Sequence, residues 1–75
     1  MKLDVFIKKF AAEFDDTPES DFVASTEFKE LDEWSSLTAL AIISMVDDEF
    51  DKNITGADIR SCKTIEDLYN LVIAK

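Results

Sequence analysis

Two adjacent serines, Ser35 and Ser36, stand where an irregular stretch of the chain passes into an apolar run of helical spacing. The first amides of a helix point outward with unmet hydrogen bonds and positive partial charge, so a helix start favours an anion. A serine at that position is well placed to carry a phosphate ester on its hydroxyl. Serine is also a common helix cap, and position alone favours capping as the role of both residues.

The rest of the chain offers little for catalysis. It contains no histidine, which excludes the Ser-His and Cys-His forms of nucleophilic catalysis. Its one cysteine, Cys62, can form neither an internal disulfide nor a cysteine-based zinc site, and we interpret it as a half-buried structural thiol. Paired carboxylates can catalyse on their own, but nothing in so short a chain indicates a substrate pocket. We therefore expect a protein that is not an enzyme.

A cluster of oxygen-bearing side chains raises the question of a metal. Asp47, Asp48, Glu49, Asp51 and Asn53 are of the types that bind calcium. An EF-hand loop, however, needs Gly at its sixth position and Glu at its twelfth. The chain does not have this spacing, so we expect no dedicated metal site.

Apolar periodicity predicts the first helix and the loop after it. The helix has the i, i+3, i+4 pattern and is expected to end around residues 15–18, because Pro18 disfavours helix at the residue before it. Its apolar face consists of Leu3, Phe6, Ile7, Phe10, Ala11 and Phe14. Residues 17–34 lack a clean period and are predicted to form a long ordered loop. The loop is expected to be pinned to the core by Phe22, Val23, Phe28 and Leu31, with Trp34 as a further anchor.

Capping signals mark three more helices. Ser35 is a candidate N-cap for a second helix over residues 36–51. Thr55 with Asp58 predicts a short third helix over residues 56–61, and Thr64 with Asp67 opens a final helix. The final helix carries Ile65, Leu68, Tyr69, Leu71, Val72 and Ile73. We therefore expect an all-α four-helix bundle with three main helices, a short third helix and a long first loop.

The second helix has two apolar faces. At about 100° per residue, one core-facing stripe is formed by Ala39, Ile42, Ile43, Val46 and Phe50. The opposite side carries Leu37, Leu40, Ala41 and Ser44, with Asp47 and Asp48 toward its C-terminal end. A helix on the outside of a small domain cannot easily bury both faces. The second face either packs under the long loop or is an exposed partner-binding surface, and both interpretations stay open.

Size and charge limit the possible partners. With 75 residues the chain is expected to form a single domain, residues 1–75, and a monomer. Its net charge of −9 disfavours nucleic acids and anionic membranes. No apolar run suits a signal peptide or a transmembrane helix, so we expect a cytoplasmic protein without membrane insertion. The acidity serves either solubility alone or attraction to proteins with basic patches.

The run LDEWSSLTAL over residues 31–40, followed by Asp47, Asp48, Glu49 and Phe50, resembles the acyl carrier protein and peptidyl carrier protein family. That family has an Asp-Ser-Leu attachment motif at the start of a helix that ends in an acidic run and an aromatic residue. Here the motif reads SSL over residues 35–37. Helix order, loop length and acidity are also similar over essentially the full chain.

The resemblance implies a carrier that leaves the chemistry to partner enzymes. A phosphopantetheinyl transferase would attach 4′-phosphopantetheine from coenzyme A to Ser36. The thiol of this cofactor would hold an acyl or aminoacyl group as a thioester, placed there by a loading enzyme and used by downstream synthases or transferases. Partner enzymes would recognise Leu37, Leu40, Ala41, Asp47 and Asp48.

The chain departs from the family pattern at three positions. Ser35 replaces the usual Asp, and Thr38 and Ala41 stand where carriers of fatty acid biosynthesis are often acidic. These departures favour a specialised pathway over primary fatty acid biosynthesis. The alternative to a carrier is an acidic helical adaptor that binds proteins and holds no cofactor. Cofactor attachment at Ser36 separates the two functions.

Overall fold

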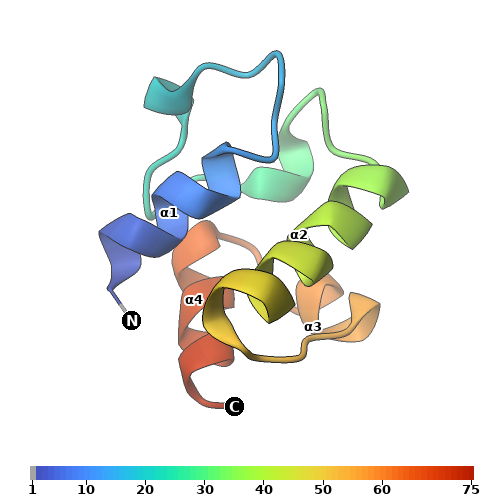
Figure 1. Ribbon diagram of the computed structural model, residues 1–75. Coiled ribbons are helices and arrows are strands. Elements are labelled where there is room, and N and C mark those ends of the chain that lie inside the picture. Colours follow the sequence, from blue (N-terminus) through green and yellow to red (C-terminus); the bar gives the residue numbers. More distant parts are fainter. Residues whose placement is uncertain (1) are drawn as a thin grey trace.

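The computed structural model describes residues 2–75, which form four α-helices and two 3₁₀ turns and contain no strand (Figure 1). The helices are α1 (Leu3–Ala11), α2 (Ser36–Phe50), α3 (Gly56–Arg60) and α4 (Ile65–Ile73). The 3₁₀ turns Glu19–Asp21 and Phe28–Glu30 lie in the long segment between α1 and α2. The predicted all-α fold, with its short third helix and long first loop, is confirmed. Within residues 2–75 no helix has the length and apolar character needed to cross a membrane.

The core is built around aromatic side chains. α1 packs against both α2 and α4, and α3 packs against the same two helices. The largest fully buried side chains are Phe6, Phe10, Phe28, Ile42, Val46, Ile65, Leu68 and Val72. Burial of each such side chain contributes roughly 1.5–3 kcal/mol. The core therefore joins all three main helices to the loop that leads into α2.

α1 is shorter than its apolar pattern predicts. It ends at Ala11, and the chain then tightens: the amide of Phe14 donates to the carbonyl of Ala11, three residues earlier, at 3.0 Å. This turn places the Phe14 ring 5.5 Å from Phe10 and 4.9 Å from Phe22, measured between ring centroids. Phe14 is therefore a core residue, as its spacing predicted, but it lies outside the helix.

α2 ends at Phe50 instead of the predicted Asp51. Asp51 has a φ of 56°, in the left-handed region, and its amide donates to the carbonyl of Asp47. Among the non-glycine residues of 2–75 it alone has a positive φ. Aspartate tolerates this conformation better than most side chains, so it can terminate a helix where glycine is more usual.

The core-facing stripe of α2 is confirmed in part and extended. Ile42 and Val46 are fully buried, while Ala39, Ile43 and Phe50 are partly buried against the core. Met45 is also buried, which the stripe did not predict. α2 packs against α3 as well as α1, so its buried face is wider than a single stripe.

The segment between α1 and α2 is ordered by backbone hydrogen bonds as well as by packing. The carbonyls of Ala24 and Thr26 accept hydrogen bonds from the first amides of α4, those of Glu66 and Ile65, at 3.0 and 3.1 Å. Phe22 and Phe28 are buried and Leu31 is partly buried, as predicted. The prediction for Val23 was wrong, since that side chain is 52% exposed in the turn from Val23 to Thr26.

Capping boxes start both C-terminal helices, as predicted. The hydroxyl of Thr55 accepts from the amide of Asp58 at 3.1 Å, and the Asp58 carboxylate accepts from the amide of Thr55 at 3.0 Å. Thr64 and Asp67 make the same pair of bonds. These local bonds satisfy amides that a helix start would otherwise leave unpaired.

Candidate functional site at the start of α2

Ser35 is the N-cap of α2. Its backbone is extended, with φ −155°, and its hydroxyl accepts from the amide of Thr38 at 3.4 Å. The hydroxyls of Ser35 and Thr38 also lie 3.2 Å apart. The predicted cap is confirmed for Ser35, and this leaves Ser36 as the first residue of the helix proper.

Ser36 is exposed, and its hydroxyl makes no hydrogen bond to any residue of 2–75. The amides of Ser36 and Leu37 likewise have no partner in that range, because the Ser35 hydroxyl binds the amide of Thr38 instead. The first turn of α2 contains no acidic side chain. Ser36 therefore lies at the positive end of a helix, where its own amide and that of Leu37 have no hydrogen-bond partner within residues 2–75.

Trp34 anchors the approach to the serines. Its ring stacks on Phe14 with centroids 6.4 Å apart and meets the edge of Phe28 at 5.0 Å. Both phenylalanines are buried, and Trp34 is partly buried against them. The predicted role of Trp34 as a loop anchor is confirmed.

Glu33 makes a second connection, which the sequence did not reveal. Its carboxylate accepts hydrogen bonds from the amides of Asp15 and Asp16, at 3.2 and 3.0 Å, and from the hydroxyl of Thr17. The bond from the Thr17 hydroxyl, followed by the backbone bonds, lowers the pKa of Glu33 below its usual range. Nothing in the local sequence distinguishes this acid from its neighbours, because its partners lie on another segment.

The second face of α2 is exposed at its N-terminal end. Leu37 is 78% exposed and Leu40 is 61% exposed, so the interpretation that they pack under the loop is wrong. Ala41 is partly buried. Asp47 and Asp48 are exposed near the other end of the helix. We call this face the α2 strip: Leu37, Leu40, Ala41, Ser44, Asp47 and Asp48.

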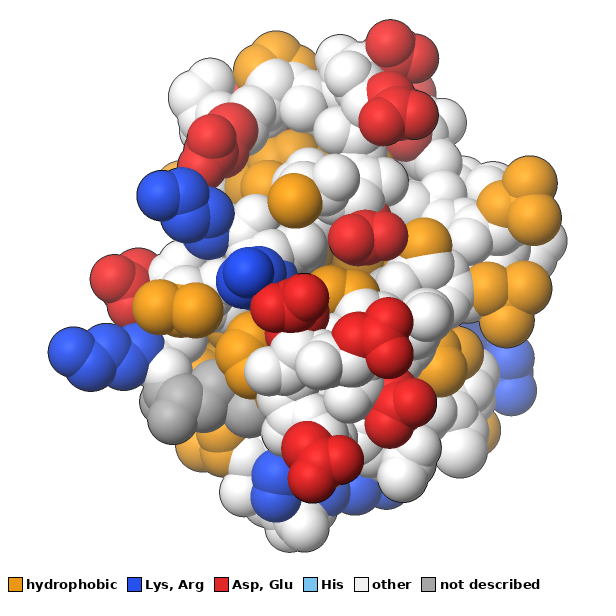
Figure 2. Space-filling view, viewed as in Figure 1, with side chains coloured by type: hydrophobic (Ala, Val, Ile, Leu, Met, Phe, Trp, Pro, Cys, Tyr) orange, Lys and Arg blue, Asp and Glu red, His pale blue; other side chains and the backbone are white. Residues whose placement is uncertain are grey.

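Charge and apolar surface are separated along α2. Figure 2 shows acidic side chains gathered over the C-terminal half of the helix and hydrophobic side chains near its beginning. Glu49 pairs with Lys9 at 3.0 Å, whereas no ion pair within residues 2–75 engages Asp47 or Asp48. The last turn of α2 has no basic residue. Acids at a helix C-terminus each cost about 0.3–1 kcal/mol, so these two are unfavourable for the helix and available to a partner.

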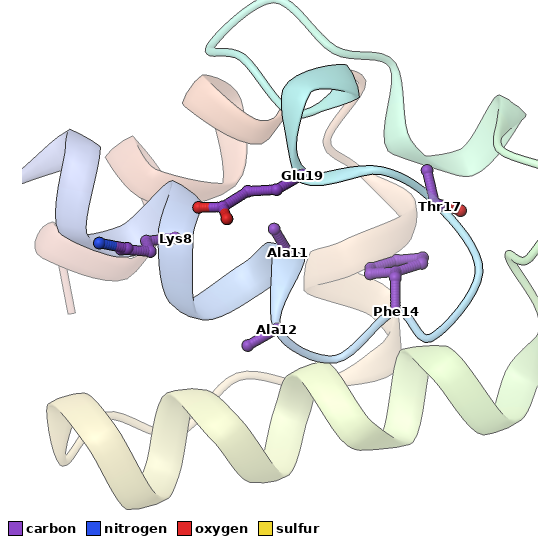
Figure 3. A pocket seen from close by; sticks show the side chains of 6 residues that line it. All are labelled: Lys8, Ala11, Ala12, Phe14, Thr17 and Glu19. Carbon is purple, nitrogen blue, oxygen red and sulfur yellow. The ribbon is translucent and has the colours of Figure 1, made fainter.

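Two cavities of the described residues are lined in part by the segment that follows α1, and neither is lined by Ser35 or Ser36. The larger, of about 360 Å³, is lined by Lys8, Ala11, Ala12, Phe14, Thr17 and Glu19. Figure 3 shows Glu19 extending from the loop toward Lys8, while Thr17 lies over Phe14 at the other end. The second, of about 300 Å³, lies among residues 16–18, Asp21 and residues 31–33. Neither cavity contains Ser36, which lies on open surface.

Neither Cys62 nor the acidic cluster around the end of α2 forms a second candidate site within residues 2–75. Cys62 is 5% exposed, and burial raises the pKa of its thiol, so it is a poor nucleophile. Among residues 2–75, no three side chains of the types His, Cys, Asp and Glu come together in a way that could hold a metal. The start of α2 is therefore the chemically distinctive part of the surface.

Comparison with known proteins identifies the family of this chain. The sequence profile of the phosphopantetheine attachment site family matches residues 5–72. Searches of curated proteins and of solved structures gave no match. The matched range includes all of α2 and α3, most of α1 and α4, and the exposed Ser36. The chain belongs to the phosphopantetheine attachment site family, whose members are non-catalytic carriers of a 4′-phosphopantetheine group.

Proposed function

We propose that this protein is an acyl or aminoacyl carrier, a single domain over residues 1–75, with 4′-phosphopantetheine attached to Ser36. The observation that carries the proposal is the state of Ser36. It is exposed, it is the first residue of a 15-residue helix, and its hydroxyl has no hydrogen-bond partner within residues 2–75. A hydroxyl that the fold does not use is available to a modifying enzyme.

The local electrostatics fit a phosphodiester at Ser36. The unpaired amides of Ser36 and Leu37 can donate to phosphate oxygens, and no acid in the first turn repels them. A negative charge at a helix N-terminus is favoured by about 0.3–1 kcal/mol. Ser35, in place of the usual acid of the motif, preserves the cap without adding a negative charge beside the attachment point.

The chemistry of attachment requires a separate transferase. The Oγ of Ser36 bonds to the phosphorus next to pantetheine, the pyrophosphate P–O bond of coenzyme A breaks, and adenosine 3′,5′-bisphosphate leaves. The hydroxyl proton goes to a base of the transferase, because this chain has no histidine and the first turn of α2 has no acidic side chain to accept it. When bound, the group supplies a thiol that holds the cargo as a thioester. The chain itself presents Ser36 on the exposed first turn of α2.

The α2 strip is the proposed surface for partner enzymes. Leu37, Leu40 and Ala41 offer an apolar patch beside the attachment point, and Asp47 and Asp48 offer unpaired charge farther along the same face. The complementary partner surface has an apolar groove with a basic rim. The transferase, the loading enzyme and the downstream synthases or transferases would share this surface, which a monomer leaves open.

We further propose a specialised pathway. Thr38 is not a surface charge but part of the helix cap, since its hydroxyl donates to the carbonyl of Glu33 at 2.8 Å. Ala41 also lacks a charge. The half of the α2 strip next to Ser36 therefore recognises partners through apolar contact, which suits enzymes other than those that read an acid at these positions.

Peptide mapping tests the proposal. The protein is incubated with coenzyme A and a broad-specificity phosphopantetheinyl transferase and digested, and the modified peptide is fragmented in the mass spectrometer to identify the serine that carries the added mass. The proposal expects the added mass on Ser36 alone. Modification of Ser35 or Ser44 instead would place the attachment point elsewhere on α2.

A further inference from the structure

Glu33 is held through its carboxylate by a segment that is distant in sequence and through its backbone carbonyl by the nearby first turn of α2. Its carboxylate binds the amides of Asp15 and Asp16 and the hydroxyl of Thr17, which follow α1. Its own carbonyl oxygen accepts the 2.8 Å hydrogen bond from the hydroxyl of Thr38 in the first turn of α2. We call this set of bonds the Glu33 clamp.

The residues of the Glu33 clamp lie on both sides of Ser36 in the chain. Ser36 lies between Glu33 and Thr38 in the chain, and Ser35 binds Thr38 as the helix cap. The neighbouring Trp34 rests on Phe14, one residue before the segment that Glu33 binds. Every residue from 33 to 35 is thus fastened to a buried ring or to a defined hydrogen-bond partner, whereas Ser36 is not.

We propose that Glu33 is a positioning residue for cofactor attachment, fixing the start of α2 so that the Ser36 hydroxyl is presented in one orientation. The inference rests on the proposed attachment at Ser36. Glu33 does not touch the reacting atoms. It acts through Thr38 and Trp34, and it restricts the motion of the helix start relative to the core.

This role makes a specific kinetic prediction. The α2 strip lies outside the clamp, so docking of the transferase persists when the clamp is broken. A loosely held nucleophile, however, spends less time in the reactive geometry. Loss of the clamp should therefore lower kcat for attachment at Ser36 while KM changes little, whereas a defect in docking would raise KM.

The experiment compares Glu33→Ala and Thr17→Val with the matched control Asp32→Ala. Asp32 is the adjacent exposed acid and makes no side-chain hydrogen bond or ion pair within residues 2–75. Attachment kinetics are measured with coenzyme A and a phosphopantetheinyl transferase at a temperature where circular dichroism shows every variant folded. Amide hydrogen exchange at Asp15 and Asp16 reports the state of the clamp independently.

The inference expects faster exchange at Asp15 and Asp16 in Glu33→Ala, with a kcat about tenfold lower and a KM within twofold of the wild type. Thr17→Val should shift kcat in the same direction, and Glu33→Gln, which keeps one acceptor oxygen, should lie between Glu33→Ala and the wild type. An unchanged kcat in folded Glu33→Ala and Thr17→Val would overturn the inference.

Two further results separate a positioning role from general destabilisation and from failure of the proposed function. Ile59→Val lowers stability in α3, far in sequence from the clamp, and should leave kcat unchanged. An equal loss of kcat in Ile59→Val would contradict the positioning role. If the wild type is loaded normally and Glu33→Ala is loaded at the same rate, the positioning role of Glu33 is wrong, while the proposed attachment at Ser36 still holds.

Discussion

The hydroxyl of Thr38 donates a 2.8 Å hydrogen bond to the carbonyl oxygen of Glu33, and this bond spans the two serines at the start of α2. The same hydroxyl lies 3.2 Å from that of Ser35. The Thr38 hydroxyl therefore connects the carbonyl of Glu33 with the hydroxyl of Ser35, which caps the helix. The attachment point is held by its neighbours while its own hydroxyl stays unused.

Removal of this hydroxyl should destabilise the start of α2. Thr38→Val keeps the branched shape but loses the bond to Glu33, at an expected cost of about 0.5–1.5 kcal/mol in the free energy of unfolding. Urea denaturation followed by circular dichroism measures the loss. Thr38→Ser is the matched control because it keeps the hydroxyl. Equal stability of the wild type and Thr38→Val would show that the bond contributes nothing.

Removing the negative charge of Asp51, the C-cap residue of α2, should stabilise the protein. Asp51→Asn keeps a side chain that tolerates φ 56° and removes a negative charge from the C-terminal end of the helix. The expected gain is about 0.3–1 kcal/mol, and it should shrink as salt is added. A thermal unfolding series at low and high ionic strength measures both effects. A drop in stability at low salt would mean that the Asp51 carboxylate has a favourable role.

Acid should weaken the fold through three carboxylates. The pKa of Glu33 is lowered chiefly by Thr17, that of Asp58 by its bond to Lys75, and that of Asp67 by hydrogen bonds from the backbone, with Thr64 first. Each folded-state pKa lies below its unfolded value, so the unfolded chain binds more protons in acid. The stabilisation is present above about pH 4.5 and is lost as the pH falls further.

Urea denaturation at steps between pH 6 and pH 3 measures this loss. Glu33→Gln and Thr17→Val should both make the stability curve flatter in acid, because each removes the depressed titration of Glu33. Curves parallel to that of the wild type in both variants would contradict the assigned cause of the shift.

Charge reversal on the α2 strip should slow partner association. Asp47→Lys with Asp48→Lys removes the acids that attract a basic surface, so the association rate with the transferase should fall and lose much of its salt dependence. The same substitutions place favourable charge at a helix C-terminus, so they are expected to keep the helix folded, and circular dichroism checks this. Stopped-flow measurements over a range of salt concentrations follow the effect.

The control for charge reversal has the same net charge but leaves the strip intact. Glu13→Lys with Glu30→Lys changes two exposed acids that lie outside α2. An equal loss of association rate in this control would show that net charge, and not the α2 strip, attracts the partner.

Local signals in the sequence predicted the helix starts well. Ser35, Thr55 and Thr64 cap their helices as predicted, because capping bonds join residues only three apart. The ends of α1 and α2 were placed too late. In both cases the apolar or polar pattern continues past the point where the backbone changes conformation, as Phe14 and Asp51 show.

The parts that depend on distant contacts could not be read from the sequence. Met45 is buried because α2 packs on two helices, and Val23 is exposed because its turn faces outward. The role of Glu33 depends on hydrogen bonds to Asp15 and Asp16, seventeen or more positions away. The candidate attachment residue itself was found from its motif and its place at a helix start.

Intact mass after incubation with coenzyme A and a phosphopantetheinyl transferase tests the central claim most directly, using the wild type, Ser36→Ala and the matched variant Ser35→Ala. We predict a gain of one phosphopantetheine in the wild type and in Ser35→Ala, and none in Ser36→Ala, with circular dichroism showing that all three are folded. A wild type that gains no mass beside a carrier that is loaded, or a Ser36→Ala protein that still gains the full mass, would contradict attachment at Ser36. The first of these results would favour a helical adaptor without a cofactor.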